Sequence, residues 1–476
     1  MVEDERREAD AGLELEAGAA DLAQRKLEED ERKRRQSRQP PVRKAFPAEL
    51  RRVDNLLVVD AEQRRCPQCS GERKCIGHEV GEVVELVPAE LIVRRDLREK
   101  LACESCEAEV VRAPVGDKVV EGGRCGPKLV GTLLVDKYLD GLPWHRQSAR
   151  YEKLGWKMPV STMADQAKWA AERLRPLWRL ALEQCVQAKV MHTDATSMPA
   201  LDKMGDKGLR IGSMWGYIGE DPVVDGEGSE QVACIIYTST GKKTKQREHE
   251  LGPEDVLALR EGYTVADASN IFDASFARPG LVECGCNMHA RRYFKKVLDS
   301  GDTRAARPLA AFKRLYGIEA DIRELPPEKK GAARAAQSRS VYDALVEWCE
   351  AYKPHEPPAT PMGKAVRYLL NHREALMRFL DDGVIPIDNG VVERLHVRTA
   401  LTRKNFLFVG SDEGGHRAAT IYTMISCCRL VEVDPVEYFA DVLPRLGGKH
   451  TRASLLELMP ARWKASRQGT PPLDVT

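Results

Sequence analysis

Several features are scarce or missing in this chain of 476 residues, and each absence excludes a class of protein. No apolar run approaches the roughly 20 residues that a membrane-spanning helix needs. The N-terminus, MVEDERREADAGLELEAG, is acidic and has no apolar stretch, which excludes an ordinary secretory signal. Neither sign of charge dominates, because 74 basic residues oppose 73 acidic ones. We therefore expect a cytoplasmic protein without a membrane partner, in which any surface for nucleic acid is locally basic.

We also expect no disulfides, although the chain has 13 cysteines. In a reducing compartment these side chains are expected to be metal ligands, core residues or free thiols. Two CxxC pairs, at 66–69 and 103–106, bracket a segment too small to fold easily on its own core. Tetrahedral Zn²⁺ bound by four thiolates suits this spacing and would help the segment to fold. We predict a structural zinc site formed by Cys66, Cys69, Cys103 and Cys106, with Cys75 and His78 as alternative ligands.

Composition predicts several units along the chain. Residues 1–31 carry 12 acidic and 4 basic side chains and residues 32–44 carry 7 basic ones, so 1–45 is expected to be a charged helical or disordered tail with a basic linker. Residues 46–115 form the zinc-finger-like module. Residues 120–186 contain helices separated by a turn, a pattern typical both of a helix-turn-helix DNA-binding segment and of plain helix packing. A catalytic domain at 187–425, with an all-helical insertion at about 290–380, precedes a helical cap at 426–462 and a disordered tail at 463–476.

Residues 188–290 follow the order three strands, helix, strand, helix, strand, which predicts an α/β sheet. Two of these strands are expected to end on an aspartate, at Asp194 and Asp267. Glu393 lies in the first turns of a helix expected to start near Gly390, capped by Asp388 or Asn389. Three carboxylates supply the hard oxygen ligands that Mg²⁺ prefers, and two such ions support in-line attack on a phosphodiester. The same residues also fit ordinary strand ends and an exposed helical face.

Several motifs occur in a fixed order over roughly residues 45–450. They are FPAELRR with CPQC and ACESC, then LVDKYLDGLPWHRQ and GWKMPVSTMADQ, then HTDAT, VADASNIFD and CNMHARRYF, and finally IDNGVVERLHVRTALTRKNFLFVGSDEGGHRAATIY. In this order they resemble transposases of the insertion-sequence 66 family. The resemblance implies an α/β multidomain protein with an RNase H-like catalytic core and an all-helical insertion, preceded by a small zinc-binding module and a helical segment.

The resemblance also implies a function and a set of site residues. Asp194, Asp267 and Glu393 would be catalytic and would hold Mg²⁺ or Mn²⁺ for cleavage at transposon ends and strand transfer into target DNA. The implied partners are the terminal repeats, target DNA, further copies of the chain on paired ends and accessory proteins of the element, in a nucleoid-associated location. The basic residues expected to contact DNA phosphates are Arg291, Arg292, Arg394, Arg398, Arg403 and Lys404.

The chain departs from the family pattern beside both aspartates. Ala195 stands where the family usually has Glu, and Ala268-Ser269 stands where it usually has Gly-Tyr. Neither change removes a proposed metal ligand.

Two other functions are alternatives to a transposase. One is a non-catalytic DNA-binding protein derived from a decayed transposase, and the other is a nuclease that cuts without strand transfer. Cys286 and His289 supply too few ligands for a closed metal site, so a structural role beside the active centre is expected; Trp215, Cys427 and Cys428 are expected in the core.

Overall fold

The computed structural model describes residues 90, 91, 93, 100–101, 111–112, 125–202, 208–222, 229–241 and 250–467. The chain divides into two compact units, Met1–Val87 and Pro88–Thr476, and all described residues belong to the second. The predicted N-terminal tail and the predicted zinc ligands Cys66, Cys69, Cys103 and Cys106 lie outside the described residues. Two short strands, β1 (Lys100–Leu101) and β2 (Val111–Arg112), pair antiparallel.

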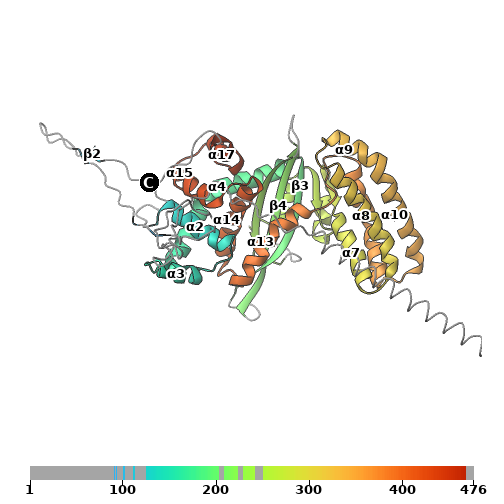
Figure 1. Cartoon of the computed structure of the whole chain (residues 1–476), viewed down its shortest axis with the longest axis horizontal. Coiled ribbons are helices and arrows are strands. Elements are labelled where there is room, and N and C mark those ends of the chain that lie inside the picture. The colour runs from blue at the N-terminus through green and yellow to red at the C-terminus, as the bar shows by residue number, and fades with distance from the viewer. Residues whose placement is uncertain are drawn as a thin grey trace, which may run out of the picture. The chain divides into compact units, whose positions relative to one another are not determined.

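A five-stranded mixed sheet in the order β5-β4-β3-β6-β7 forms the centre of the described unit (Figure 1). Its strands are β3 (Val190–Leu201), β4 (Leu209–Pro222), β5 (Ser229–Thr238), β6 (Gly262–Ala266) and β7 (Leu281–Gly285). Helix α5 (Pro253–Ala258) precedes β6, and α6 (Asp273–Phe276) precedes β7. The predicted order of strands and helices is therefore confirmed. The first three strands pair antiparallel, whereas β6 and β7 run parallel to β3.

Strand β3 is longer than the sequence predicts. It does not end on Asp194 but continues to Leu201, because β4 pairs with it along its whole length as far as Leu201↔Leu209. The second half of β3 contains Pro199, which has no N–H to donate. A proline is tolerated at this position because β6 pairs with β3 only as far as His192. Beyond His192, β3 makes no ladder with β6.

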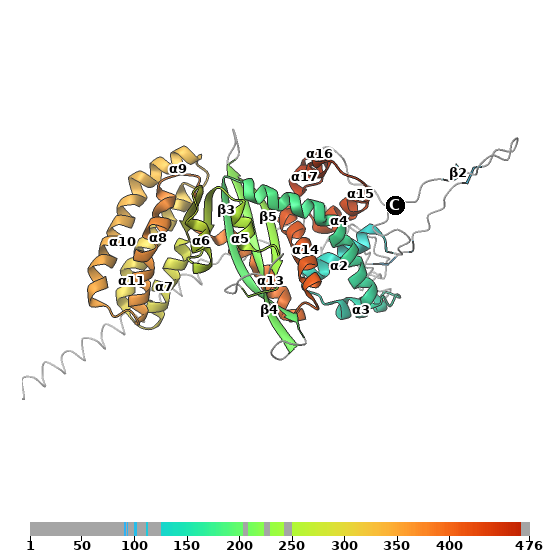
Figure 2. The same cartoon turned by 180° about the vertical axis from the view of Figure 1, so that it is seen from behind.

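Two helices cover opposite faces of the sheet, and glycines in β4 permit both approaches. A Cβ at Gly216 would come within 2.7 Å of the Nε2 atom of His396, on α13 (Gly390–Phe406). A Cβ at Gly219 would come within 2.8 Å of the Cα atom of Cys185, on α4 (Val160–Gln187). Side chains three positions apart on a strand point to opposite faces. Helix α13 therefore packs on one face and α4 on the other (Figures 1 and 2).

One helical group packs beside the β5 edge of the sheet and joins distant parts of the sequence. The group consists of α2 (Pro127–Tyr138), α3 (Trp144–Lys153), α4, α14 (Asp412–Leu430), α15 (Pro435–Arg445), α16 (Arg452–Glu457) and α17 (Pro460–Arg467). The hydroxyl of Thr423, on α14, accepts a hydrogen bond from the Ile235 amide of β5 at 2.8 Å. Buried residues of these helices and of the sheet form one continuous hydrophobic core.

The C-terminal boundaries differ from those predicted. Helix α14 continues through residue 426, where the cap was expected to begin. Helix α17 continues to Arg467, although a disordered tail was expected from residue 463. The reason is Trp463, which is buried and whose indole N–H donates to the Asp441 carboxylate at 2.7 Å. A single aromatic anchor of this kind carries no periodic signal, so the sequence pattern does not reveal it.

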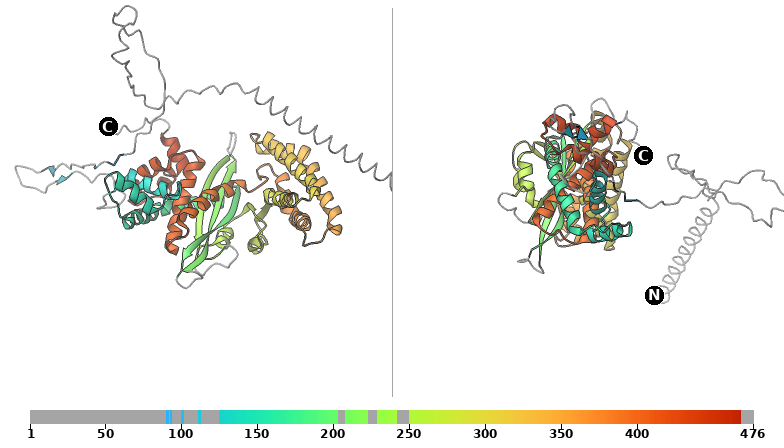
Figure 3. Two further views of the ribbon diagram at one scale, coloured as in Figure 1. Left: turned by 60° about the horizontal axis from the view of Figure 1, so that its bottom comes forward. Right: turned by 90° about the vertical axis from the view of Figure 1, so that its left-hand side faces the viewer.

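The second helical group lies on the other side of the sheet, next to β7 (Figure 3). It contains α7 (Asn287–Asp299), α8 (Ala306–Asp321), α9 (Pro327–Ala333), a π-helical turn η5 (Arg334–Ser338), α10 (Arg339–Tyr352), α11 (Pro361–Asn371) and α12 (Arg373–Met377). Short 3-10 turns occur at η3 (Asn270–Phe272), η4 (Thr303–Ala305), η6 (Lys353–His355) and η7 (Arg378–Leu380). This group has its own hydrophobic core, which includes Phe294, Phe312 and Tyr342.

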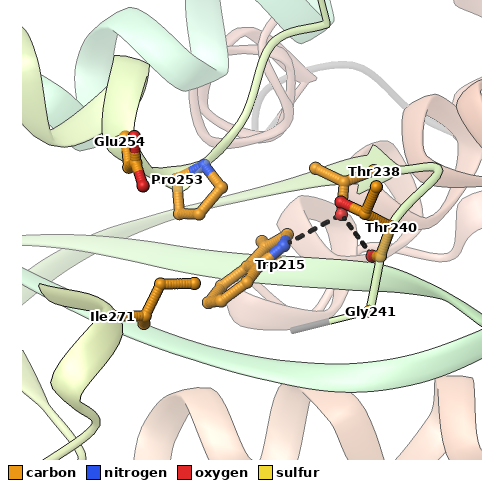
Figure 4. Close-up of a pocket in the computed structure, with 7 residues that line it drawn as sticks. All are labelled: Trp215, Thr238, Thr240, Gly241, Pro253, Glu254 and Ile271. Carbon is orange, nitrogen blue, oxygen red and sulfur yellow. Dashed lines mark hydrogen bonds between the residues drawn. The ribbon is translucent and has the colours of Figure 1, made fainter. Parts of the chain in front are cut away.

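Trp215, Cys427 and Cys428 lie in the core, as predicted. The Trp215 indole N–H donates to the Thr238 hydroxyl at 3.1 Å, beside a hollow that Figure 4 shows. The hollow measures about 10 Å³, close to the lower limit for one water molecule, so it is not a ligand site. Within the described residues, no helix combines the length and apolar character that crossing a bilayer requires.

Candidate active site

The pairing of β3 with β6 brings Asp194 and Asp267 to neighbouring positions. The two strands run parallel, and their last paired residues are His192 and Val265. Asp194 and Asp267 each lie two residues further along, Asp194 within β3 and Asp267 directly after β6. Side chains two residues apart point to the same face, so Asp194 shares the face of His192. The register therefore places Asp194 and Asp267 at corresponding positions of the backbone where β6 ends.

Helix α13 carries Glu393 onto the same face of the sheet. Glu393 lies in the first turn of α13, and His396 follows one turn later. The Nε2 atom of His396 lies 3.0 Å from the Asp194 carbonyl oxygen. Gly216 pairs with Asp194 across the β3–β4 ladder, and its missing side chain leaves the space that the imidazole fills. Residues three apart on a helix share a face, so Glu393 and His396 both face the sheet near Asp194.

Asn389 links the start of α13 to β3. Its side chain is fully buried, and its Nδ2 group donates to the Thr193 carbonyl oxygen at 2.8 Å. Its Oδ1 atom lies 3.0 Å from Nδ1 of His192. Both partners precede Asp194 by one or two residues. The Asn389 side chain therefore bonds to strand β3 and does not cap helix α13. The Asp388 carboxylate accepts a hydrogen bond from the Gly390 amide at 2.8 Å.

The carboxylate of Glu393 lies among residues of the β7–α7 junction. Its Oε2 atom accepts a hydrogen bond from Arg292 at 3.2 Å, and its Oε1 atom lies 3.7 Å from Nδ1 of His289. The Sγ atom of Cys286 completes a group whose ligand atoms all lie within 4.8 Å of one another. Cys286 and His289 therefore lie beside the candidate site, as expected from the sequence.

The second helical group reaches the loop after Asp267 through Tyr368, on α11. Burial raises the pKa of the Tyr368 phenol, and the charges of Cys286, Tyr293 and Asp267 add to this, whereas a hydrogen bond from the Ala268 amide lowers it. The ring of Tyr368 stacks on that of Tyr293, with 4.5 Å between the centroids. Tyr368 thus remains a neutral hydrogen-bonding group at neutral pH and ties the helical group to the Asp267 loop.

The basic residues predicted to contact DNA occupy different environments. Arg291, Arg394, Arg398 and Lys404 are exposed. Arg292 is also exposed but contacts Glu393. Arg403 is half-buried and donates to the Ser197 carbonyl oxygen of β3, so its guanidinium is already engaged within the protein.

Sequence reasoning missed His192, Tyr368 and His396 as parts of the site, and it treated Asn389 only as a possible helix cap. Two signals were available. His192 precedes Asp194 by two residues and therefore shares its strand face. His396 follows Glu393 by three residues and therefore shares its helix face. Tyr368 gave no comparable signal, because its contact with the Asp267 loop joins distant parts of the chain.

Replacing Asn389 with Ala should destabilise this junction. The variant leaves the Thr193 carbonyl and the His192 ring without their partner in a fully buried position. We expect the free energy of unfolding to fall by roughly 2–4 kcal/mol, measured by urea denaturation. Asn405→Ala, on the same helix but exposed, is the matched control and should lower it by less than about 0.5 kcal/mol. Equal stability of the two variants would mean that Asn389 does not anchor α13.

The fold is that of a mixed α/β protein in which helix α13, with Glu393 in its first turn, packs against the central strand that contains Asp194. Comparison with known families identifies it further. Residues 122–417 match the Transposase IS66 family, and residues 63–107 match the zinc-finger binding domain of transposase IS66, a span that contains all four predicted zinc cysteines. The chain therefore belongs to the IS66 family of transposases, which supports a transposase role, DNA binding and a zinc-finger domain.

Similar proteins occur in Sinorhizobium fredii (strain NBRC 101917 / NGR234). The chain is 32% identical to the uncharacterized protein y4hP over 455 residues, which cover 91% of this chain and 79% of that protein. It is 30% identical to the uncharacterized protein y4jD over 426 residues, which cover 89% of this chain and 82% of that protein. The similarity thus extends over nearly the whole chain.

Proposed function

We propose that this protein cuts DNA at the ends of an insertion sequence and joins the freed ends to target DNA, using Asp194, Asp267 and Glu393 as metal ligands. The proposed catalytic domain is an RNase H-like core at about 187–425, with the second helical group as its insertion. The mixed sheet, with its antiparallel first three strands and parallel last two, supports this assignment. The observation that carries the proposal is the β3–β6 register, in which Asp194 and Asp267 each lie two residues beyond the last paired residues.

The donor set suits a hard divalent cation. Asp194, Asp267 and Glu393 offer carboxylate oxygens, the ligands that Mg²⁺ and Mn²⁺ prefer. The Oε1 atom of Glu393 is buried and has no hydrogen-bond partner among the described residues, so it is available to a cation. When bound, a pair of such ions would activate the attacking water or 3′-hydroxyl and stabilise the leaving oxygen. The protein's own contribution would be to hold Asp194 on β3, Glu393 on α13 and Asp267 directly after β6.

Several residues would orient this site rather than react. Asn389 holds the start of α13 against β3, and His396 holds the next turn against Asp194. Arg292 fixes one oxygen of Glu393 and leaves the other free. The exposed Arg394, Arg398 and Lys404 extend the same helix with positive charge and would contact DNA phosphates. The remaining proposed elements, inferred from family resemblance, are structural Zn²⁺ on the four N-terminal cysteines, an oligomer on paired ends, accessory proteins and nucleoid association.

Strand cleavage of an end-labelled fragment tests the proposal. The substrate carries the terminal sequence of the element that encodes this chain, with a second, unlabelled plasmid as target. The expected result is a nick at the element end with Mg²⁺, no nick with EDTA, and labelled ends joined to the target. Nicking without joining would indicate a nuclease. Binding without nicking, even with the neighbouring gene products added, would contradict the proposed chemistry.

Arg398→Ala should weaken DNA binding without sequence preference. The side chain is exposed on α13, and a phosphate contact contributes through counterion release. The slope of log K against log salt concentration should become shallower by about one unit, measured by fluorescence anisotropy on specific and unrelated duplexes. The control is Arg323→Ala, an exposed arginine of the second helical group. Unchanged slopes in both variants would remove Arg398 from the DNA-contacting set.

A further inference from the structure

Cys286, His289 and Glu393 form a cluster of different chemical character from the carboxylate set. Cys286 lies between β7 and α7, His289 lies in the first turn of α7, and Glu393 lies in the first turn of α13. One sulfur, one nitrogen and one oxygen atom of these side chains all lie within 4.8 Å of one another. The sequence offered only two ligands here, and the fold adds the third.

The spacing of two of these atoms is close to that of metal ligands. Nδ1 of His289 and Oε1 of Glu393 lie 3.7 Å apart. Ligands about 2.0 Å from a tetrahedral Zn²⁺ ion lie about 3.3 Å apart, so a small side-chain rotation closes the difference. Both atoms are buried and neither has a hydrogen-bond partner among the described residues. A cation between them would satisfy both.

The sulfur atom of Cys286 is prepared for the same role. It is fully buried and accepts a hydrogen bond from the Asn389 amide at 3.3 Å. Burial raises the pKa of this thiol to about 12, while the Asn389 and His289 amides lower it. The sulfur lies within reach of a cation held by His289 and Glu393.

Arg292 can remain beside such an ion if part of its side chain changes position. Its guanidinium holds Oε2 of Glu393, which leaves Oε1 as the coordinating oxygen. Coordination at Nδ1 places the His289 proton on Nε2, which lies 3.4 Å from Arg292. Because about half of the Arg292 side chain is exposed, at 47%, it has room to turn away from this proton.

We infer that Cys286, His289 and Glu393 form a site for a thiophilic divalent cation such as Zn²⁺ or Cd²⁺, with one coordination position left open. Soft thiolate and imidazole ligands select such ions, whereas Mg²⁺ requires oxygen. The site shares Glu393 with the carboxylate set. Its consequence, which rests on the proposed function, is that a thiophilic cation withdraws Glu393 from Asp194 and Asp267 and inhibits Mg²⁺-dependent cleavage.

Cadmium titration of the full-length, metal-free, reduced protein tests the site without DNA. Cd²⁺–thiolate absorption in the ultraviolet reports binding, and the number of ions bound at saturation is compared between variants. Cys286→Ser removes the sulfur ligand, and His289→Ala removes the nitrogen ligand while keeping the thiol. Cys284→Ser is the matched control, because it removes another buried thiol two residues away. Circular dichroism and thermal unfolding show whether each variant is folded.

The expected result is that wild type and Cys284→Ser bind one ion more than Cys286→Ser and His289→Ala. Equal numbers in all four proteins would overturn the site, as would retention of the extra ion in His289→Ala. If Cys286→Ser does not fold, the partly exposed His289→Ala decides the outcome. Because binding is measured without DNA, a failure of strand cleavage in the wild type would contradict the proposed function and leave the cation site standing.

Discussion

Replacing Glu393 with Gln should abolish Mg²⁺-dependent cleavage while DNA binding and folding remain intact. The amide is nearly isosteric but loses the negative charge that holds a cation. We expect the rate of strand cleavage to fall by about 10³-fold or more, equivalent to roughly 4 kcal/mol of transition-state stabilisation. The measurement is single-turnover cleavage of the labelled element end, with anisotropy to verify binding.

The matched control for this variant is Glu374→Gln, because Glu374 also lies in the first turn of a helix but is exposed. It should cleave at the wild-type rate. A Glu393→Gln protein that cuts as fast as this control would exclude Glu393 from the site. Loss of cleavage together with loss of the folded state would instead assign it a structural role.

Replacing Arg260 with Met should cause a large loss of stability. Arg260 is buried and donates to the carbonyl oxygens of Val186, Ala188, Lys189 and Tyr263. These carbonyls lie at the end of α4, before β3 and in β6, so one side chain ties together the starts of β3 and β6. Methionine keeps much of the volume but donates nothing. We expect the free energy of unfolding to fall by about 3–5 kcal/mol in urea denaturation.

Arg278→Met provides the comparison. Arg278 also donates to several backbone carbonyls, those of Leu257, Ala258 and Arg260, but it is only half-buried. Water can replace its hydrogen bonds, so a loss of about 1 kcal/mol is expected. If the Arg260 variant were no less stable than the Arg278 variant, the carbonyl contacts of Arg260 would not be what joins the two strands.

The sequence predicted the order of the sheet elements, because apolar, strand-forming runs bounded by turn signals identify strands. It also placed Glu393 in the first turns of a helix starting near Gly390, which the structure confirms. The predicted end of β3 at Asp194 was wrong. The residues after Asp194 include polar ones that are not typical of a buried strand, and pairing with β4 stabilises them as one. Strand pairing is a tertiary effect that the local sequence pattern does not contain.

Contacts between distant segments account for the remaining differences. Asn389 bonds to Thr193, 196 positions away, and Arg403 bonds to Ser197, 206 positions away. A single sequence gives no signal for such pairs. Basic residues near Glu393 were therefore all assigned to DNA, whereas Arg403 is engaged with β3 and Arg292 with Glu393 itself. The family match confirms the zinc-finger module, whereas the bound Zn²⁺ and the other N-terminal predictions remain predictions, because they lie outside the described residues.

Iron-directed cleavage of the polypeptide tests the central claim most directly. Fe²⁺ bound in place of Mg²⁺ reduces added hydrogen peroxide to hydroxide and a hydroxyl radical, and ascorbate returns the resulting Fe³⁺ to Fe²⁺. The radicals cut the backbone beside the metal ligands, and mass spectrometry locates the cuts. Cuts are expected near Asp194, Asp267 and Glu393 together, all suppressed by excess Mg²⁺ and by Asp194→Ala. Cuts confined to the Cys286–His289 segment and Glu393, with none near the two aspartates, would contradict the proposed catalytic site.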